Sequence, residues 1–226
     1  MRRILAASAG LLAGLAIAGQ AMAADLGRRS QMPVKAPEYM APIYLWTGSY
    51  IGINGGGGWG ESSWSGAPAT GNFDLSGGLI GGTIGYNWQQ GPWVLGLEAD
   101  LDWSDIRGTT TVNCALGCET RNTWLGTVRG RVGYAFDRFM PYFTGGLAVG
   151  EVEANRPVFG GDSETRAGWT VGGGLEFALV GNWTAKAEYL HVDLGEFDCG
   201  TRCGAATPDD VSFTANIVRG GLNYRF

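Results

Sequence analysis

Acidic and basic side chains recur at every second position within stretches that are otherwise apolar or rich in glycine. In residues 93–103, WVLGLEADLDW, the odd positions are apolar and the even positions include Glu98, Asp100 and Asp102. Carboxylates and cations in a water-poor space form ion pairs, because an unpaired buried charge is very unfavourable. We therefore predict one balanced ion-pair network made of Glu98, Asp100, Arg129, Arg131, Glu176, Lys186, Glu188 and Arg219.

Four cysteines form two C-x₃-C motifs, Cys114 with Cys118 and Cys199 with Cys203. Four thiolates could hold zinc, but close cysteine pairs in zinc sites are usually separated by two residues. Exported proteins also meet an oxidising compartment, which favours disulfides. We predict two local disulfides, one within each motif, although four cysteines permit three pairings. No metal and no cofactor is expected.

The single histidine, His191, raises the alternative of a hydrolase. Such an enzyme needs a nucleophile within reach of the imidazole, and the local string His191-Val192-Asp193 supplies only an acid that could orient the ring. We favour a histidine without a catalytic role, and no catalytic residue is predicted.

Two glycine runs, GGGGWG and GGLIGG, resemble phosphate-binding loops superficially. Neither run is followed by a helical pattern or by Lys-Ser/Thr, so the signal is weak. Glycine within a strand permits bending and close approach of neighbouring backbones, which is the interpretation that we favour.

The elements that must position these residues follow from the period of two, which is typical of β-strands and recurs about eight times. Short turns are expected at 89–92, 137–138 and 180–182, and long polar loops at 61–71, 104–120, 153–165 and 193–211. Tight turns at one end and long loops at the other are typical of an outer-membrane barrel. The expected strands cover residues 48–60, 73–88, 93–103, 123–136, 139–152, 168–179, 183–192 and 212–226.

We predict an all-β fold for residues 46–226, an eight-stranded antiparallel transmembrane up-and-down β-barrel with short periplasmic turns and long extracellular loops. Its apolar face meets lipid, and side chains just fill the interior of so small a barrel, so the charges form a lumen network. Asp102 lies nearer the rim and is expected to be solvated. An aromatic girdle is expected beside the short turns, made of Trp88, Trp93, Tyr134, Phe136, Trp183 and Tyr224.

The alternative fold is a secreted β-sandwich with the same alternation. A sandwich buries its apolar face and solvates the other face, so it has no need of balanced acids and bases there. The rhythm of the connections and the aromatic strand ends favour the barrel.

The N-terminus has the layout of a secretory signal peptide, with Arg2 and Arg3 before an apolar run and Ala21-Met22-Ala23 after it. We predict a signal peptide at 1–23 and a proline-containing periplasmic tether at 24–45. The formal net charge is −5, and removal of the two arginines makes it −7. An acidic chain has no basic surface for nucleic acid, so no nucleic-acid partner is expected.

Several strings resemble the small outer-membrane porin family of alphaproteobacteria, the outer-membrane immunogenic protein type within the OmpA-like barrels. They are WTGSYIGINGGGGWG, GYNWQQGPWVLGLEADL, YFTGGLAVG, GWTVGGGLEFALVGNWTAKAEYLHVDLG and the ending GGLNYRF. The resemblance covers roughly residues 46–226. It implies a barrel in the outer membrane of a Gram-negative cell, and a terminal Phe226 that acts as a signal for the barrel assembly machinery.

The resemblance also implies partners and a function. The expected partners are outer-membrane lipid and lipopolysaccharide, the assembly machinery during biogenesis, and peptidoglycan or lipoproteins through the tether. The expected function is a structural barrel with surface-exposed loops and at most a narrow pore. A general diffusion porin and, more remotely, an outer-leaflet lipid-modifying enzyme are the alternatives.

Overall fold

A computed structural model describes residues 44–64, 71–113, 117–156, 160–198 and 210–226. These residues form eight antiparallel strands, each paired with its neighbours in sequence, and β1 also pairs with β8 to close the barrel. Closure confirms the expected fold class and excludes the two-sheet sandwich. The strands are β1 (Gly48–Trp64), β2 (Gly71–Gln90), β3 (Trp93–Thr110), β4 (Cys118–Tyr134), β5 (Phe139–Arg156), β6 (Gly160–Ala178), β7 (Trp183–Asp198) and β8 (Asp210–Arg225).

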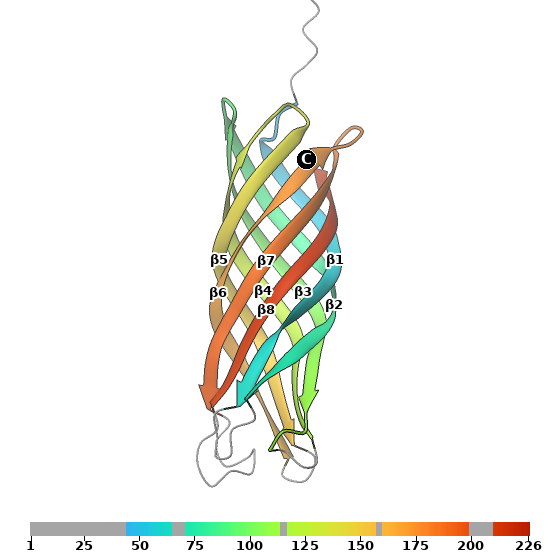
Figure 1. Ribbon diagram of the computed structural model, residues 1–226. Helices are drawn as coiled ribbons and strands as arrows, with labels where there is room; N and C mark the ends of the chain where they lie inside the picture. Colours follow the sequence, from blue (N-terminus) through green and yellow to red (C-terminus); the bar gives the residue numbers. More distant parts are fainter. Residues whose placement is uncertain (1–43, 65–70, 114–116, 157–159, 199–209) are drawn as a thin grey trace, which may run out of the picture. The chain divides into compact units, whose positions relative to one another are not determined.

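The three short connections, β2–β3, β4–β5 and β6–β7, lie at the same end of the barrel as the C-terminus (Figure 1). We call this end the turn end and the opposite end the loop end. Each short connection contains one residue with positive φ, namely Gly91, Asp137 and Gly181. Asp137 is the only one of the three that is not glycine, and its carboxylate accepts a hydrogen bond from the Tyr44 N–H.

An apolar belt surrounds the half of the wall nearer the turn end. Its side chains are large and exposed; Ile53, Leu97 and Phe143 are 68%, 67% and 80% exposed. The belt runs on β3 from Trp93 to Trp103, which a rise of ~3.3 Å per residue and a tilt of about 40° convert to about 25 Å along the axis. That height matches the apolar band of outer-membrane barrels. Among the described residues no helix is long and apolar enough to span a membrane.

The polarity of the wall reverses beyond this belt. On β2, Ile80 and Ile84 point outward beside the inward Thr83, whereas nearer the loop end Phe73 and Leu75 are buried inside. The same reversal occurs on β8, where the inward residues change from Arg219 to Ile217, Ala215 and Phe213. A closed wall that leaves the lipid meets water on its outer face, so the apolar side chains move to the lumen.

This reversal corrects the predicted loops. The strands are 16 to 20 residues long, whereas crossing the bilayer needs about 9–11, so they continue into the stretches that we expected to be loops. The outward residues of these extensions are polar, which made them look like loop sequence. The pairing register also shifts between Trp103 and Ile106 on β3, Asn122 and Trp124 on β4, and Asp193 and Glu196 on β7. On β4 the extra residue changes the phase of the alternation, so that Asn122 and Leu125 both face inward.

Candidate functional site: the filled lumen

The structure places all eight residues of the expected ion-pair network inside the barrel, each at most 5% exposed. They come from five strands. β3 carries Glu98 and Asp100, β4 carries Arg129 and Arg131, β6 carries Glu176, β7 carries Lys186 and Glu188, and β8 carries Arg219. The alternation of each strand explains this, because the neighbouring residues on either side point to the lipid.

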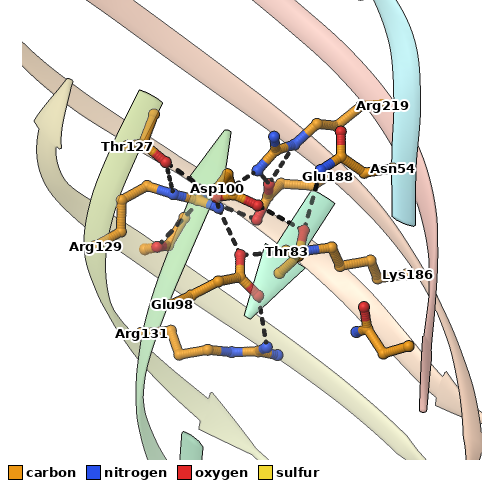
Figure 2. Close-up of polar contacts among 12 residues, drawn as sticks. Asn54, Thr83, Glu98, Asp100, Thr127, Arg129, Arg131, Lys186, Glu188 and Arg219 are labelled. Atoms are coloured by element: carbon orange, nitrogen blue, oxygen red, sulfur yellow. Dashed lines mark hydrogen bonds and ion pairs between the residues drawn. The ribbon is translucent and has the colours of Figure 1, made fainter. Parts of the chain in front are cut away.

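Arg129 joins two sides of the lumen. Its Nη2 atom lies 2.5 Å from Glu98 Oε1, on the adjacent strand in direct register, and 2.6 Å from Asp100 Oδ2. Its Nη1 atom lies 3.0 Å from Glu188 Oε2 on β7, three strands away around the wall. The guanidinium therefore crosses the interior, and Figure 2 shows it between the three carboxylates.

Arg219 makes a second crossing from β8. Its Nη2 atom lies 2.7 Å from Glu188 Oε1 and 3.0 Å from Asp100 Oδ2, and its Nη1 atom lies 2.8 Å from Asp102 Oδ2. Arg129 and Arg219 thus share the Asp100 and Glu188 carboxylates (Figure 2). Shared, charge-assisted hydrogen bonds of this kind make the four groups a connected unit.

The other two cations lie on the side of the network nearer the turn end. Arg131 Nη2 lies 2.6 Å from Glu176 Oε2, and the Lys186 ammonium lies 3.0 Å from Glu98 Oε1. Tyr50 and Tyr142 complete this layer. The Tyr50 hydroxyl donates to Glu98, the Tyr142 hydroxyl donates to Glu188, and the Arg131 guanidinium carbon lies 4.1 Å from the Tyr142 ring centre.

Neutral polar side chains donate two further hydrogen bonds to the Asp100 carboxylate. The Thr83 hydroxyl donates to Oδ1 at 2.6 Å and the Thr127 hydroxyl donates to Oδ2 at 2.9 Å. Asn54 Nδ2 in turn donates to the Thr83 hydroxyl at 3.0 Å (Figure 2). These residues face the lumen on β1, β2 and β4, and the charge pattern alone gave no reason to include them in the site.

Asp102 corrects one sequence expectation. We expected it to be solvated at the rim, but it is 1% exposed and paired with Arg219. The strand continues past Asp102 to Thr110, so this position is in the middle of the wall and not at its edge. The network therefore has five carboxylates against four cations, namely Glu98, Asp100, Asp102, Glu176 and Glu188 against Arg129, Arg131, Lys186 and Arg219.

An apolar cluster fills the lumen between the ion-pair network and the loop end. It includes Phe73, Leu75, Ile106, Val152 and Phe213, none more than 9% exposed, and it draws on β2, β3, β5 and β8 as well as β7. Close-packed side chains of this kind exclude water. The polar pattern of the loops gave no indication of this cluster, and the signal that could have found it is the inward alternation of Phe213, Ala215 and Ile217.

A smaller apolar group closes the turn end. The Trp46 side chain is fully buried against Val94, Met140, Tyr142 and Ala178. Its indole N–H donates to the Asp137 carbonyl at 2.9 Å, and its backbone N–H donates to Gln89 at 2.7 Å. Tyr44, which we placed at the end of the tether, packs its ring 4.9 Å from that of Trp46. The rest of the expected tether and the expected signal peptide, residues 1–43, lie outside the described residues.

The residues expected in the aromatic girdle lie together near the turn end. Trp93 contacts Tyr134, Tyr134 contacts Phe136, and Trp183 contacts Tyr224, with ring centres 4.7 to 5.3 Å apart. Trp88, on the paired strand β2, is 54% exposed. Phe226 ends the chain here with 76% exposure, and its N–H donates to the Ser49 carbonyl.

A second ring of tryptophans lies where the wall changes polarity. It comprises Trp59, Trp103, Trp124 and Trp169, of which Trp103 and Trp124 are direct cross-strand neighbours. We call it the loop-side girdle. This second girdle of tryptophans was not predicted from the sequence. Their common position next to the first outward polar residues is the signal that we missed, because indole rings favour the membrane–water interface.

The remaining candidates have limited structural information. Cys118 is disulfide-bonded, but Cys114, Cys199 and Cys203 lie outside the described residues, so the pairing stays a prediction. In the described part of the chain no cluster of three His, Cys, Asp or Glu side chains is arranged to hold a metal.

His191 Nδ1 lies 2.9 Å from Asn216 Oδ1, and its ring lies 5.4 Å from that of Trp169. Neither neighbour is a nucleophile. The two glycine runs are parts of β1 and β2 and do not form a phosphate loop.

Comparisons with known proteins identify relatives along almost the whole chain. A family model for an outer membrane protein β-barrel domain matches residues 9–226. The chain is 39% identical to the 31 kDa outer-membrane immunogenic protein of Brucella melitensis over 243 residues, which covers 96% of this chain and 98% of that protein. It is 34% identical to a 22 kDa outer membrane protein of Rhizobium leguminosarum bv. viciae, over 82% of this chain and 80% of that protein. The solved structure of Neisserial surface protein A is similar at 15% identity and a TM-score of 0.46, covering 80% of this chain and 98% of that one.

Proposed function

The chain belongs to the outer membrane protein β-barrel family, and we propose that it is a structural barrel with a sealed lumen that presents its loop end at the cell surface. It is an outer-membrane protein, as its relatives are. The finer role, structural or pore-forming, depends on what occupies the interior, because eight strands leave room only for side chains or for a very narrow path.

The observation that carries the proposal is that two different fillings lie in series along the lumen. Ions would first meet a network in which Arg129 and Arg219 cross from one wall to the other. They would then meet the apolar cluster around Phe213, where the buried hydroxyls of Ser62 and Thr120 already hydrogen-bond each other and cannot readily replace hydration water. A diffusion porin needs a continuous aqueous path, and wide channels are formed by about 16 strands.

We also propose that the protein is not an enzyme. The charged side chains of the network are buried and held in ion pairs, so a substrate outside the barrel does not reach them. His191, the residue that raised the lipid-modifying alternative, hydrogen-bonds Asn216, and its ring packs at a tilted angle against Trp169. Both contacts suit an interfacial histidine.

The proposed partners follow from the surfaces. The exposed apolar belt contacts membrane lipid, and the outer leaflet of lipopolysaccharide surrounds the loop-side girdle. Phe226, exposed beside β1, is the residue that the assembly machinery would recognise during insertion. Contact with peptidoglycan or lipoproteins would involve residues 24–43, which the structure does not describe.

Planar-bilayer recording of the refolded full chain tests the proposal. We expect no stable conductance above that of a bilayer with detergent alone. Stable, ion-selective steps that vanish when the protein is first heat-denatured would show that the chain is a porin. The gel mobility of the same sample should be compared with and without boiling, so that an absence of conductance is interpreted only for folded protein.

A further inference from the structure

Two hollows lie on the same part of the outer wall, formed mainly by β8, β1 and β2, and Trp103 of β3 and Lys186 of β7 also line the first. The first has a volume of about 700 Å³ and lies in the apolar belt, where Ile53, Ile80, Trp103 and Leu222 line it and Gly55 and Gly220 contribute backbone. The second has a volume of about 410 Å³ and lies nearer the loop end. Its lining includes Trp59, Glu61, Asn72, Asp74, Ser212 and Thr214.

Two glycines of the apolar hollow, the outward Gly55 and Gly220, are not required by packing within the chain. A Cβ atom added at Gly55 would lie 3.5 Å from its nearest neighbour, and one at Gly220 would lie 3.8 Å away, which are ordinary contacts. The inward glycines differ. A Cβ atom at Gly56 would overlap the Val218 carbonyl oxygen, and one at Gly81 would overlap the Asp102 carboxylate. Space inside the barrel thus explains the inward glycines, whereas the space left by the outward ones is available to a molecule outside the wall.

Two acidic side chains face each other across the polar hollow, an arrangement that does not stabilise the barrel. Glu61 and Asp74 lie directly opposite each other on β1 and β2, and like charges in that position are unfavourable. Asn72 Nδ2 donates to Glu61 Oε2 at 3.0 Å. Carboxylates accept hydrogen bonds from hydroxyl groups and repel phosphate. Trp59, which is 52% exposed, adds a flat apolar ring at the boundary between the two environments.

We propose that this face binds one glycolipid molecule of the surrounding leaflet, with an acyl chain in the apolar hollow and sugar hydroxyls in the polar hollow. The apolar hollow is continuous with the lipid-contacting belt, so its occupant is hydrocarbon. The two acids favour a headgroup that presents hydroxyls over one that presents only a phosphate. The inference depends on the membrane location of the chain and is independent of whether the lumen conducts.

Native mass spectrometry of the full chain tests this site, after extraction from nanodiscs that contain equal amounts of glucosyl diacylglycerol, which presents hydroxyls and no phosphate, and phosphatidic acid, which presents only a phosphate. We expect the wild type to retain one glycolipid, at least tenfold in preference to phospholipid. Gly55→Leu with Gly220→Leu fills the apolar hollow and should reduce retention at least tenfold. The matched control is Gly130→Leu with Gly145→Leu on the opposite wall, where an added Cβ atom also has space; it should retain the glycolipid.

The polar hollow has its own variant, Glu61→Gln with Asp74→Asn, which leaves the wall packing intact and tests the site even if the leucine variant fails to insert. It should weaken glycolipid retention and raise the share of phospholipid, whereas Glu151→Gln with Glu153→Gln on β5 should do neither. Equal retention by all variants, or equal retention of both lipids by the wild type, would overturn the proposal. A dimer that the Gly55 and Gly220 changes abolish would instead identify a second copy of the chain as the occupant.

Discussion

Arg129 on β4 and Glu188 on β7 meet at 3.0 Å although two strands, β5 and β6, separate them around the wall, so a single side-chain contact spans the barrel interior. Arg129 also contacts Glu98 and Asp100, and all four side chains are at most 1% exposed. Mutations of this residue therefore test how the charges inside the barrel are solvated.

Replacing Arg129 with alanine should lower the free energy of unfolding by about 3–5 kcal/mol, because it leaves three carboxylates short of a partner in a dry interior. Urea unfolding in lipid vesicles measures this. Glu98→Gln or Asp100→Asn in the same chain should restore part of the loss, but neither should restore all of it since the other acids remain. The control is Arg107→Ala, whose pair with Asp105 is exposed and should contribute under ~1 kcal/mol. If the free energy of unfolding of Arg129→Ala equals that of the wild type, the charges inside the barrel are hydrated.

Replacing Leu97 with arginine should lower the free energy of unfolding by about 2–4 kcal/mol, because this exposed side chain lies near the middle of the apolar belt. The acid next to it in sequence, Glu98, points to the lumen and cannot pair with the new charge. Addition of Glu98→Gln should therefore not rescue the variant. Thr109→Arg, on the outer face of the same strand beyond the belt, is the control and should lower the free energy of unfolding by no more than about 0.5 kcal/mol.

Replacing Phe213 with alanine should lower the free energy of unfolding by about 3–5 kcal/mol, because the ring lies in the apolar cluster and is 2% exposed. Its neighbour Thr214 points outward, so Thr214→Ala should change the value by less than about 0.5 kcal/mol. Equal effects at the two positions, by the same urea titration, would contradict an apolar core beyond the membrane.

The ion-pair network and the apolar cluster should each block conductance through the lumen, so both must be removed before ions pass. Arg129→Ala with Arg219→Ala should stay silent in planar bilayers, because the apolar cluster still excludes water. Phe213→Ala with Leu75→Ala should also stay silent, since the network remains. All four changes together, in chains that still show heat-modified mobility, should produce measurable ion flow. Conductance from either pair alone would mean that the other filling does not seal.

Thiol labelling tests the cysteines. Unreduced, denatured protein from the outer membrane should show no free thiol, and reduction should expose all four. Mass mapping of the unreduced peptides then distinguishes local bridges, Cys114–Cys118 and Cys199–Cys203, from bridges between the two motifs. Four labelled thiols without reduction would refute the disulfide prediction.

The period of two predicted the strands, because each strand within the membrane separates one apolar and one polar face. The short and long connections and the aromatic strand ends were then needed to favour a closed barrel over a sandwich. The same pattern predicted that Glu98 and Asp100 lie opposite Arg129 and Arg131, and the structure adds that Glu98 and Arg129 are in direct register on adjacent strands. It could not predict that Arg129 reaches Glu188, because side-chain reach across a lumen depends on closure. It also misjudged Asp102 and the strand ends, because beyond the belt the polar face turns outward and resembles loop sequence.

The reversal of polarity along the wall has a consequence for recognition from outside the cell. Beyond the loop-side girdle, the water-facing outer surface includes Glu61, Asp74, Arg107, Glu151 and Thr165, which come from five different strands. Neighbouring residues on this surface are distant in sequence and are brought together by pairing such as that of Glu61 with Asp74. An antibody or phage that binds there would recognise a discontinuous epitope, present on folded barrels and lost from denatured chains and from peptides that copy single segments.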